Sequence, residues 1–206
     1  MNWRGKIAIT LKLRKEFSFM KKIAVFCGAA EGESPRYTAA AQQLGKYLAN
    51  HQMGLVYGGG KYGLMGQIAT AVLESGGYVE GIIPQNLADR GASYSAISKL
   101  EVVENMPVRK QRMMELADGF VALPGGPGTL EEIAEVYSWS LIGENAKPCA
   151  LYNVAHYYDA LQEFYDRMVK NGFLAKPARE KLLFSDSLDE IFQFINSYTP
   201  PAIRQY

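Results

Sequence analysis

Residues 124–132 combine a glycine-rich turn with a hydroxyl group and two carboxylates. They read Pro-Gly-Gly-Pro-Gly-Thr-Leu-Glu-Glu and follow the apolar run 119–123. This order predicts a strand, a tight turn and a helix. Such a turn exposes backbone N–H groups at the positive end of a helix, where a phosphate is readily bound. Because the same helix carries Glu132 to this place, the segment indicates chemistry on a phosphorylated substrate.

The same residues also have a purely structural interpretation. Thr129 and Glu132 satisfy the capping-box pattern, in which the hydroxyl accepts a hydrogen bond from one backbone N–H and the carboxylate from another. A capping box does not require Gly125, Gly126 and Gly128 in front of it, and glycines carry a backbone-entropy cost. We therefore favour a phosphate-binding loop over a simple helix cap.

A second glycine-rich loop follows another strand-like run. Residues 58–63 match the dinucleotide fingerprint Gly-x-Gly-x-x-Gly, and Glu80 lies about 20 residues further on. However, Glu80 precedes Gly-Ile-Ile and so falls inside the next strand rather than at its carboxyl end. A phosphate loop of the Walker A type fails, because residues 64–65 are Leu-Met. A dinucleotide-dependent oxidoreductase and a glycine turn that only permits close packing remain as alternatives.

A basic cluster opens the helix expected before the fifth strand. Arg109 and Lys110 fall in its first turn, where positive charge opposes the helix dipole, so they indicate a compensating anion. A planar guanidinium suits phosphate or ribose oxygens, which makes Arg109 the stronger candidate. For Arg112 we prefer a structural pairing with Glu115 along the helix. His51 and His156 are isolated and lack metal-ligand spacing, so no metal site is predicted.

The elements that must position these residues alternate along the chain. Short apolar runs predict strands at Lys22–Cys27, Gly54–Tyr57, Tyr78–Ile83, Leu100–Val103, Gly119–Leu123 and Cys149–Tyr152. Helical patterns cover Ser34–Asn50, Leu64–Ser75, Pro107–Ala117, Thr129–Ile142, Tyr157–Asn171 and Leu188–Tyr198. This alternation predicts an α/β fold with a Rossmann-like, doubly wound parallel sheet. Small or glycine-rich loops follow the first, second and fifth strands, so we expect them to converge at one sheet edge.

Composition narrows the class of protein. The 206 residues are 48% hydrophobic with a net charge of +1, which permits a substantial core and shows no electrostatic footprint for nucleic acid or a membrane surface. The two cysteines lie in apolar runs, as in a reduced cytoplasmic protein. No apolar stretch is long enough to span a membrane. We expect residues 1–19 to be an extension outside the fold and residues 20–206 to form a single nucleotide-binding catalytic domain.

Three segments together resemble the LOG ("lonely guy") family of cytokinin riboside 5′-monophosphate phosphoribohydrolases, many of which were once labelled lysine decarboxylases. These segments are residues 57–66, 106–110 and 123–132, and the last matches the pattern PGGxGTxxE at every fixed position. The resemblance runs from about residue 21 to about residue 195. It implies a Rossmann-like fold, usually dimeric, and release of the base from a nucleoside 5′-monophosphate to give ribose 5-phosphate.

The resemblance also implies roles for individual residues. Arg109 and Glu132 would form the catalytic pair, and Lys110 would help to bind the nucleotide. The other substrate-binding positions would be Gly58, Gly59, Gly60, Gly125, Gly126, Pro127, Gly128, Thr129, Leu130, Glu131 and Ser138. Many relatives carry an acid near the position of Gly91, and Asp89 is the neighbouring candidate to replace it. Base preference is therefore open between a cytokinin nucleotide, AMP and another nucleotide.

The local chemistry agrees with this activity. Breaking a ribosyl–base bond builds positive charge at the anomeric carbon, which a carboxylate stabilises. The phosphate serves as a remote handle that fixes the sugar. No metal or redox cofactor is required, whereas lysine decarboxylation would ordinarily need a pyridoxal-phosphate lysine that nothing in the sequence indicates. A nucleotide-binding or cofactor-binding carrier without turnover is the principal alternative; Glu132 in the matched motif argues against it.

Overall fold

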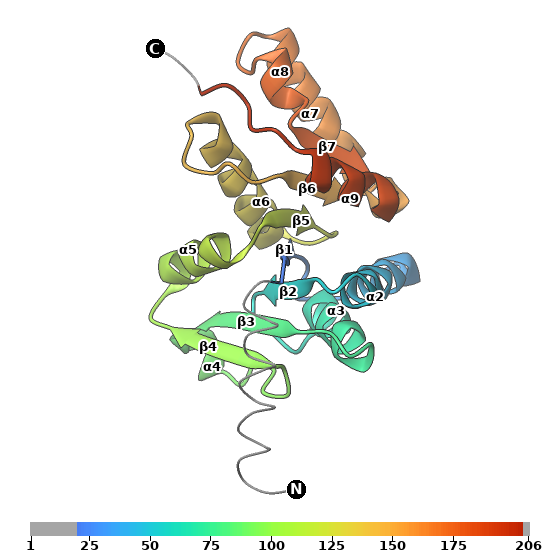
Figure 1. Cartoon of the computed structure of the whole chain (residues 1–206), viewed down its shortest axis with the longest axis vertical. Helices are drawn as coiled ribbons and strands as arrows, with labels where there is room; N and C mark the ends of the chain where they lie inside the picture. Colours follow the sequence, from blue (N-terminus) through green and yellow to red (C-terminus); the bar gives the residue numbers. More distant parts are fainter. Residues whose placement is uncertain (1–19, 204–206) are drawn as a thin grey trace, which may run out of the picture.

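The structure, a computed structural model, describes residues 20–203. The expected extension, residues 1–19, lies outside this range, and the assignment of the rest to a single domain stays a prediction. Within the described range the strands form one sheet (Figure 1). They are β1 (Lys22–Phe26), β2 (Gly54–Tyr57), β3 (Val79–Pro84), β4 (Lys99–Val103), β5 (Gly119–Ala122), β6 (Cys149–Tyr152) and β7 (Leu182–Ser185).

The sheet is parallel throughout and its order is β4-β3-β2-β1-β5-β6-β7. The chain builds outward from β1 to β4, returns to the centre at β5 and then builds outward on the other side. Strand order therefore reverses between β1 and β5, and in open α/β sheets ligands bind outside the carboxyl ends of the strands at this point. The expected doubly wound α/β fold is confirmed.

Helices cover both faces of the sheet. They are α2 (Pro35–Asn50), α3 (Gly63–Glu74), α4 (Gln85–Ala88), α5 (Met106–Leu116), α6 (Pro127–Leu141), α7 (Asp159–Lys170), α8 (Lys176–Arg179) and α9 (Leu188–Ser197), with a 3₁₀ turn η1 (Val154–His156). In Figure 1, α2, α3 and α9 lie on one side of the sheet and α5 and α6 on the other. No helix among residues 20–203 is long and apolar enough to cross a lipid bilayer.

Burial on both faces explains the strand sequences. Residues 23–26 of β1 are 0–3% exposed, and β2 and β5 are buried along their full lengths. Leu44 of α2 and Ile68 of α3 pack in the core on one face, and Met113 of α5 packs in the core on the other. The core thus holds the central strands rigidly, and the loops that leave their carboxyl ends are well positioned to carry a site.

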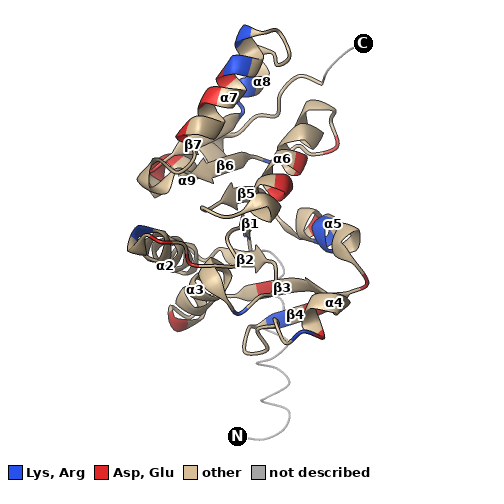
Figure 2. Cartoon of the chain, turned by 180° about the vertical axis from the view of Figure 1, so that it is seen from behind, with Lys and Arg blue, Asp and Glu red and all other residues tan. Residues whose placement is uncertain are grey.

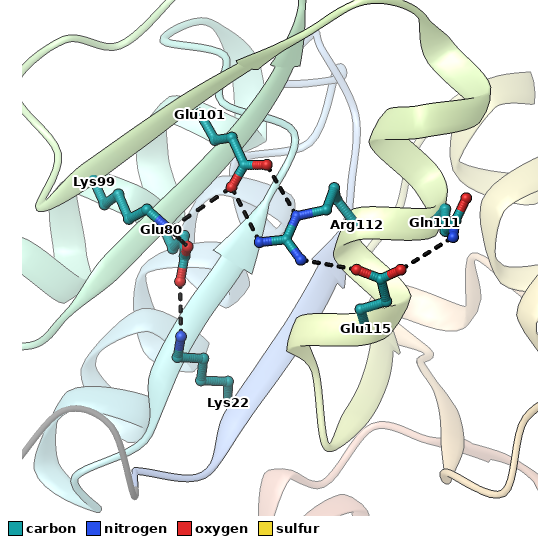
Figure 3. Close-up of polar contacts among 7 residues, drawn as sticks. All are labelled: Lys22, Glu80, Lys99, Glu101, Gln111, Arg112 and Glu115. Atoms are coloured by element: carbon teal, nitrogen blue, oxygen red, sulfur yellow. Dashed lines mark hydrogen bonds and ion pairs between the residues drawn. The ribbon is translucent and has the colours of Figure 1, made fainter.

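A buried carboxylate network lies at the opposite, amino half of the sheet (Figure 3). Glu80 of β3 is 1% exposed, and its oxygens accept hydrogen bonds from Lys22 Nζ at 2.7 Å and Lys99 Nζ at 2.5 Å. Burial, the largest single influence, raises the pKa of Glu80, but the hydrogen bonds and charges of both lysines outweigh it and lower the pKa overall. Glu80 is thus a structural anion, and the sequence reasoning that placed it inside a strand is confirmed.

The network continues onto α5 through Arg112. Its Nε lies 2.9 Å from Glu101 on β4, and its Nη1 lies 2.8 Å from Glu115 one turn along the helix (Figure 3). The expected pairing of Arg112 with Glu115 is therefore present. These contacts fix α5 against the sheet, and α5 also carries Arg109.

Candidate active site

Three loops meet where the strand order reverses. The Gly28 N–H donates a hydrogen bond to the Pro124 carbonyl at 3.1 Å, and a side chain at Gly28 would come within 3.4 Å of Gly125 Cα. Gly63 has a φ of +59°, and a Cβ there would overlap the backbone of Ala29. The loops after β1, β2 and β5 are therefore in direct contact, which confirms their expected convergence.

The start of α6 differs from the capping-box interpretation. The helix begins at Pro127, its N-cap is Gly126, and no side chain caps it. Thr129 is thus already the third helical residue, because proline at the first position begins the helix two residues earlier than expected. The capping-box interpretation was wrong, and Glu132 lies in the second turn with no capping role.

Arg109 is held in the site by a backbone carbonyl of β3 and by a methionine of its own helix. Its side chain is largely buried, and its Nε donates a hydrogen bond to the Ile82 carbonyl of β3 at 3.2 Å. Nη1 also lies 3.0 Å from the sulfur of Met106. A Cβ at Gly58 would collide with the guanidinium, so glycine at this position leaves room for Arg109. This contact explains structurally why the glycine loop and the arginine occur together.

Arg109 and Glu132 form an ion pair across the carboxyl edge of the sheet. Nη1 of Arg109 lies 2.9 Å from Oε1 of Glu132. Apart from this ion pair, Oε1 is buried without a hydrogen-bond donor among the described residues. Burial raises the pKa of the Glu132 carboxyl, while the charge of Arg109 opposes this shift. The site thus contains a buried carboxylate oxygen with unused acceptor capacity.

Lys110 makes different contacts from Arg109. Its Nζ lies 2.5 Å from Glu131 and 2.9 Å from Glu135, both on α6. Figure 2 shows acidic positions on the α6 ribbon and basic positions on the ribbon of α5. Lys110 therefore ties the two helices together, and its charge is compensated within the chain. Ser138, another predicted substrate contact, is exposed on α6, and its side chain makes no hydrogen bond within residues 20–203.

The second glycine loop is held by the segment before β4. The Tyr94 N–H donates to the Gly59 carbonyl at 2.9 Å, and Gly60 forms a bridge with Ser93. Asp89 instead accepts a hydrogen bond from the side chain of Gln85, four residues earlier. Gly91, at the position where relatives often have an acid, is exposed with a φ of +72°. Neither Asp89 nor Gly91 contacts the ion pair in the described structure.

A cavity of about 400 Å³ adjoins the glycine loop of residues 124–126. Its walls are mainly apolar and include Leu64 and the aromatic rings of Tyr37 and Tyr157. The sequence reasoning did not identify these tyrosines. The adjacent pair Tyr157-Tyr158, preceded by an asparagine in a turn, was the available signal. No cluster of three or more potential metal-ligating side chains occurs within residues 20–203.

Comparison with known proteins places these features in a family. The family described as "possible lysine decarboxylase" matches residues 65–195. Cytokinin riboside 5′-monophosphate phosphoribohydrolase LOG7 of Arabidopsis thaliana is 42% identical over 89% of this chain and 84% of its own length. Cytokinin riboside 5′-monophosphate phosphoribohydrolase LOG of Oryza sativa subsp. japonica is 40% identical over 89% of this chain and 76% of its own length.

Solved structures share the fold at lower identity. The molybdenum cofactor binding protein of Rippkaea orientalis superimposes with a TM-score of 0.67 at 21% identity, covering 86% of this chain and 96% of its own. The molybdenum cofactor carrier protein of Chlamydomonas reinhardtii gives 0.65 at 20% identity, covering 86% and 99%. At these identities the likeness establishes the fold alone.

Proposed function

The chain belongs to the LOG family of cytokinin riboside 5′-monophosphate phosphoribohydrolases, and we propose that it hydrolyses the N-glycosidic bond of a nucleoside 5′-monophosphate. The products are the free base and ribose 5-phosphate. The observation that carries this proposal is the Arg109–Glu132 pair beside the glycine loop at the start of α6. The loop suits the phosphate, and the carboxylate suits the sugar carbon that reacts.

The proposed mechanism uses the charge of Glu132. As the ribosyl–base bond lengthens, positive charge develops on the anomeric carbon, and the ionised carboxylate stabilises it. The unused acceptor, Oε1, is available for a hydrogen bond from the attacking water or from a ribose hydroxyl. The water oxygen bonds to the anomeric carbon, the electrons of the broken bond leave with the base, and the proton released by the water ends on the base.

Arg109 has two tasks in this mechanism. Its hydrogen bond to the Ile82 carbonyl and its ion pair with Glu132 fix the carboxylate against the sheet. Its remaining donors can reach phosphate or ribose oxygens, which a planar guanidinium binds well. Lys110 orients the pair indirectly by tying α5 to α6.

A panel of nucleotides tests the proposal. Cytokinin riboside monophosphates, AMP and other purine and pyrimidine monophosphates are incubated with the protein, and free base is detected by chromatography. We expect a kcat/KM for the preferred monophosphate far above that for its nucleoside, because the phosphate loop contributes only to the former. Comparable values for AMP and adenosine would refute the phosphate-dependent mechanism. Binding without product from any nucleotide would favour a carrier, the function in the names of the structural neighbours above.

We also propose that the chain is a homodimer or a larger homo-oligomer. Val136 and Tyr137 of α6 are buried in the core of their own chain. Near the end of α6, Trp139 and Ile142 are 37% and 48% exposed. Exposed apolar groups of this kind are typical of protein contacts. Light scattering at micromolar concentration should give at least twice the mass of one chain.

A further inference from the structure

The backbone of the glycine loop after β5 is held by its carbonyl groups. The carbonyls of residues 123, 124 and 125 each accept a hydrogen bond from another part of the fold. Their donors are the hydroxyl of Tyr158 at 2.7 Å, the N–H of Gly28 at 3.1 Å and the hydroxyl of Tyr157 at 2.5 Å. Two of these three restraints therefore come from adjacent tyrosines.

The amide groups of the same loop have no hydrogen-bond acceptor among residues 20–203. Within the described chain, the N–H groups of Gly125, Gly126 and Gly128 donate no hydrogen bond to another residue, and Pro127 has no N–H. Free amides are expected in the first turn of a helix, and a loop whose amides point the same way forms a cradle for an anion. The loop thus has its acceptors turned to the protein and its donors available to a ligand.

The two tyrosines follow a backbone turn in an unusual conformation. Ala155 has a φ of 53° and His156 a φ of 62°, in the left-handed region that residues with a side chain rarely adopt. The turn is held by Asn153, whose side chain accepts a hydrogen bond from the Tyr158 N–H at 2.7 Å. Such conformations persist only where the surroundings impose them, and they concentrate at functional sites.

The ring of Tyr157 is fixed by its neighbours. It packs edge-to-face against Tyr158, with centroids 5.0 Å apart, and against Tyr37, with centroids 5.7 Å apart. Tyr158 is 4% exposed and belongs to the core, whereas Tyr157 is 43% exposed and lines the cavity. Both are tied to the loop, but only Tyr157 is also accessible to solvent.

We propose that Tyr157 is a positioning residue for the substrate phosphate: its hydroxyl holds the Gly125 carbonyl so that the amides of the loop face the ligand. This inference rests on the proposed function, because it assigns the loop to the phosphate of a nucleotide. Tyr157 acts through the backbone of the loop and takes no part in the bond-breaking step. Its loss should therefore weaken phosphate binding selectively.

The variant Tyr157→Phe tests this assignment, since it retains the ring contacts and removes only the hydroxyl. We expect KM for AMP and the inhibition constant of ribose 5-phosphate to rise together by about five- to tenfold, within the range for one lost hydrogen bond. kcat should change less than KM, and the residual rate on adenosine should stay unchanged. Tyr37→Phe is the matched control, because its ring also contacts Tyr157 but its hydroxyl has no partner within residues 20–203.

Two results would overturn the inference. One is an unchanged KM and inhibition constant in Tyr157→Phe; the other is an equal loss on AMP and adenosine, which would indicate general distortion of the site. Calorimetric titration with inorganic phosphate keeps this test separate from that of the function. If the wild type cleaves no nucleotide, the proposed function fails, but weaker phosphate binding by Tyr157→Phe alone still supports the positioning role.

Discussion

Glu80 on β3 and Glu132 on α6 are both buried carboxylates, yet their surroundings differ. Glu80 has two lysines within hydrogen-bond distance and a lowered pKa. Glu132 has a single ion pair, with Arg109, and its buried Oε1 has no other donor in the described chain. The pKa of Glu132 is raised. A fully compensated carboxylate stabilises a fold, whereas an under-compensated one retains capacity to interact with a ligand. The comparison separates a structural acid from the acid that we propose to be catalytic.

The largest effect is expected from Glu132→Gln. The amide keeps the size of the side chain but removes the negative charge opposite the developing ribosyl cation, so kcat should fall by roughly a hundredfold or more. The melting temperature should stay within a few degrees of the wild type, because burial already disfavours the charged form of Glu132. Steady-state kinetics and thermal melting check the two parts. Near-normal turnover would show that the catalytic carboxylate lies elsewhere.

Glu80→Gln should give the reverse pattern. It leaves Lys22 and Lys99 without their shared anion, which should lower the free energy of unfolding by about 1–3 kcal/mol. The cost is below that of a fully buried pair, since the Lys99 side chain is 48% exposed. Chemical denaturation measures this loss, and kcat/KM at a temperature where the variant is folded should match the wild type. A specific loss of activity would break the distinction between the two acids.

Arg109 and Arg112 extend the comparison to one helix. Arg109→Lys cannot keep both the hydrogen bond to the Ile82 carbonyl and the contact with Glu132, so kcat/KM should fall by about tenfold. Arg112→Lys, one turn further, should leave kcat/KM unchanged and cost less than about 1 kcal/mol of stability, as is typical of partly exposed pairs. Equal effects of the two substitutions on activity would contradict the separation.

The smallest effect is a difference in pH dependence. The proposed mechanism needs Glu132 ionised, and its pKa is raised. As pH is lowered, kcat/KM should therefore begin to fall while the pH is still above the ordinary carboxyl value of 4.5, and should then decrease tenfold per pH unit. Its contribution to folding stability runs oppositely, present at low pH and lost as pH rises through the raised pKa. For Glu80, with a lowered pKa, the contribution is present above 4.5 and lost as pH falls. The stability difference between wild type and Glu80→Gln should therefore shrink in acid, which melting curves at several pH values would measure.

Most of the fold could be predicted because its strands are short, apolar and separated by helices of clear periodicity. β2 and β6 have the predicted boundaries, β1, β4 and β5 differ by one residue at one end, and β3 is shifted by one residue at both ends. The edge strand β7 was missed, because its apolar run, Leu-Leu-Phe, is only three residues long. The single-turn helices α4 and α8 were also missed, since one turn shows no periodicity.

The candidate site was predictable in its residue types but not in its contacts. The motifs indicated Arg109 and Glu132, yet the unused acceptor on Glu132 depends on the angle between two side chains from different helices. The capping-box alternative failed because one proline moved the helix start. Tyr157 was missed because its contact with Gly125 joins segments that are far apart in the sequence. Such contacts depend on tertiary geometry, which no local pattern records.

The position of β1 at the centre of the sheet also governs how the chain reaches this structure. β1 pairs with β2 on one edge and with β5 on the other. The second edge of β1 is covered only when Ile23 pairs with Gly119, which lies far along the chain. Parallel pairings of such long separation make folding slow, because loop closure precedes the contacts that reward it. During synthesis on the ribosome, β1 emerges before the other described strands. Its apolar residues 23–26 have no strand on one edge until β5 has been made. Aggregation of nascent chains should therefore be most sensitive to substitutions in this strand.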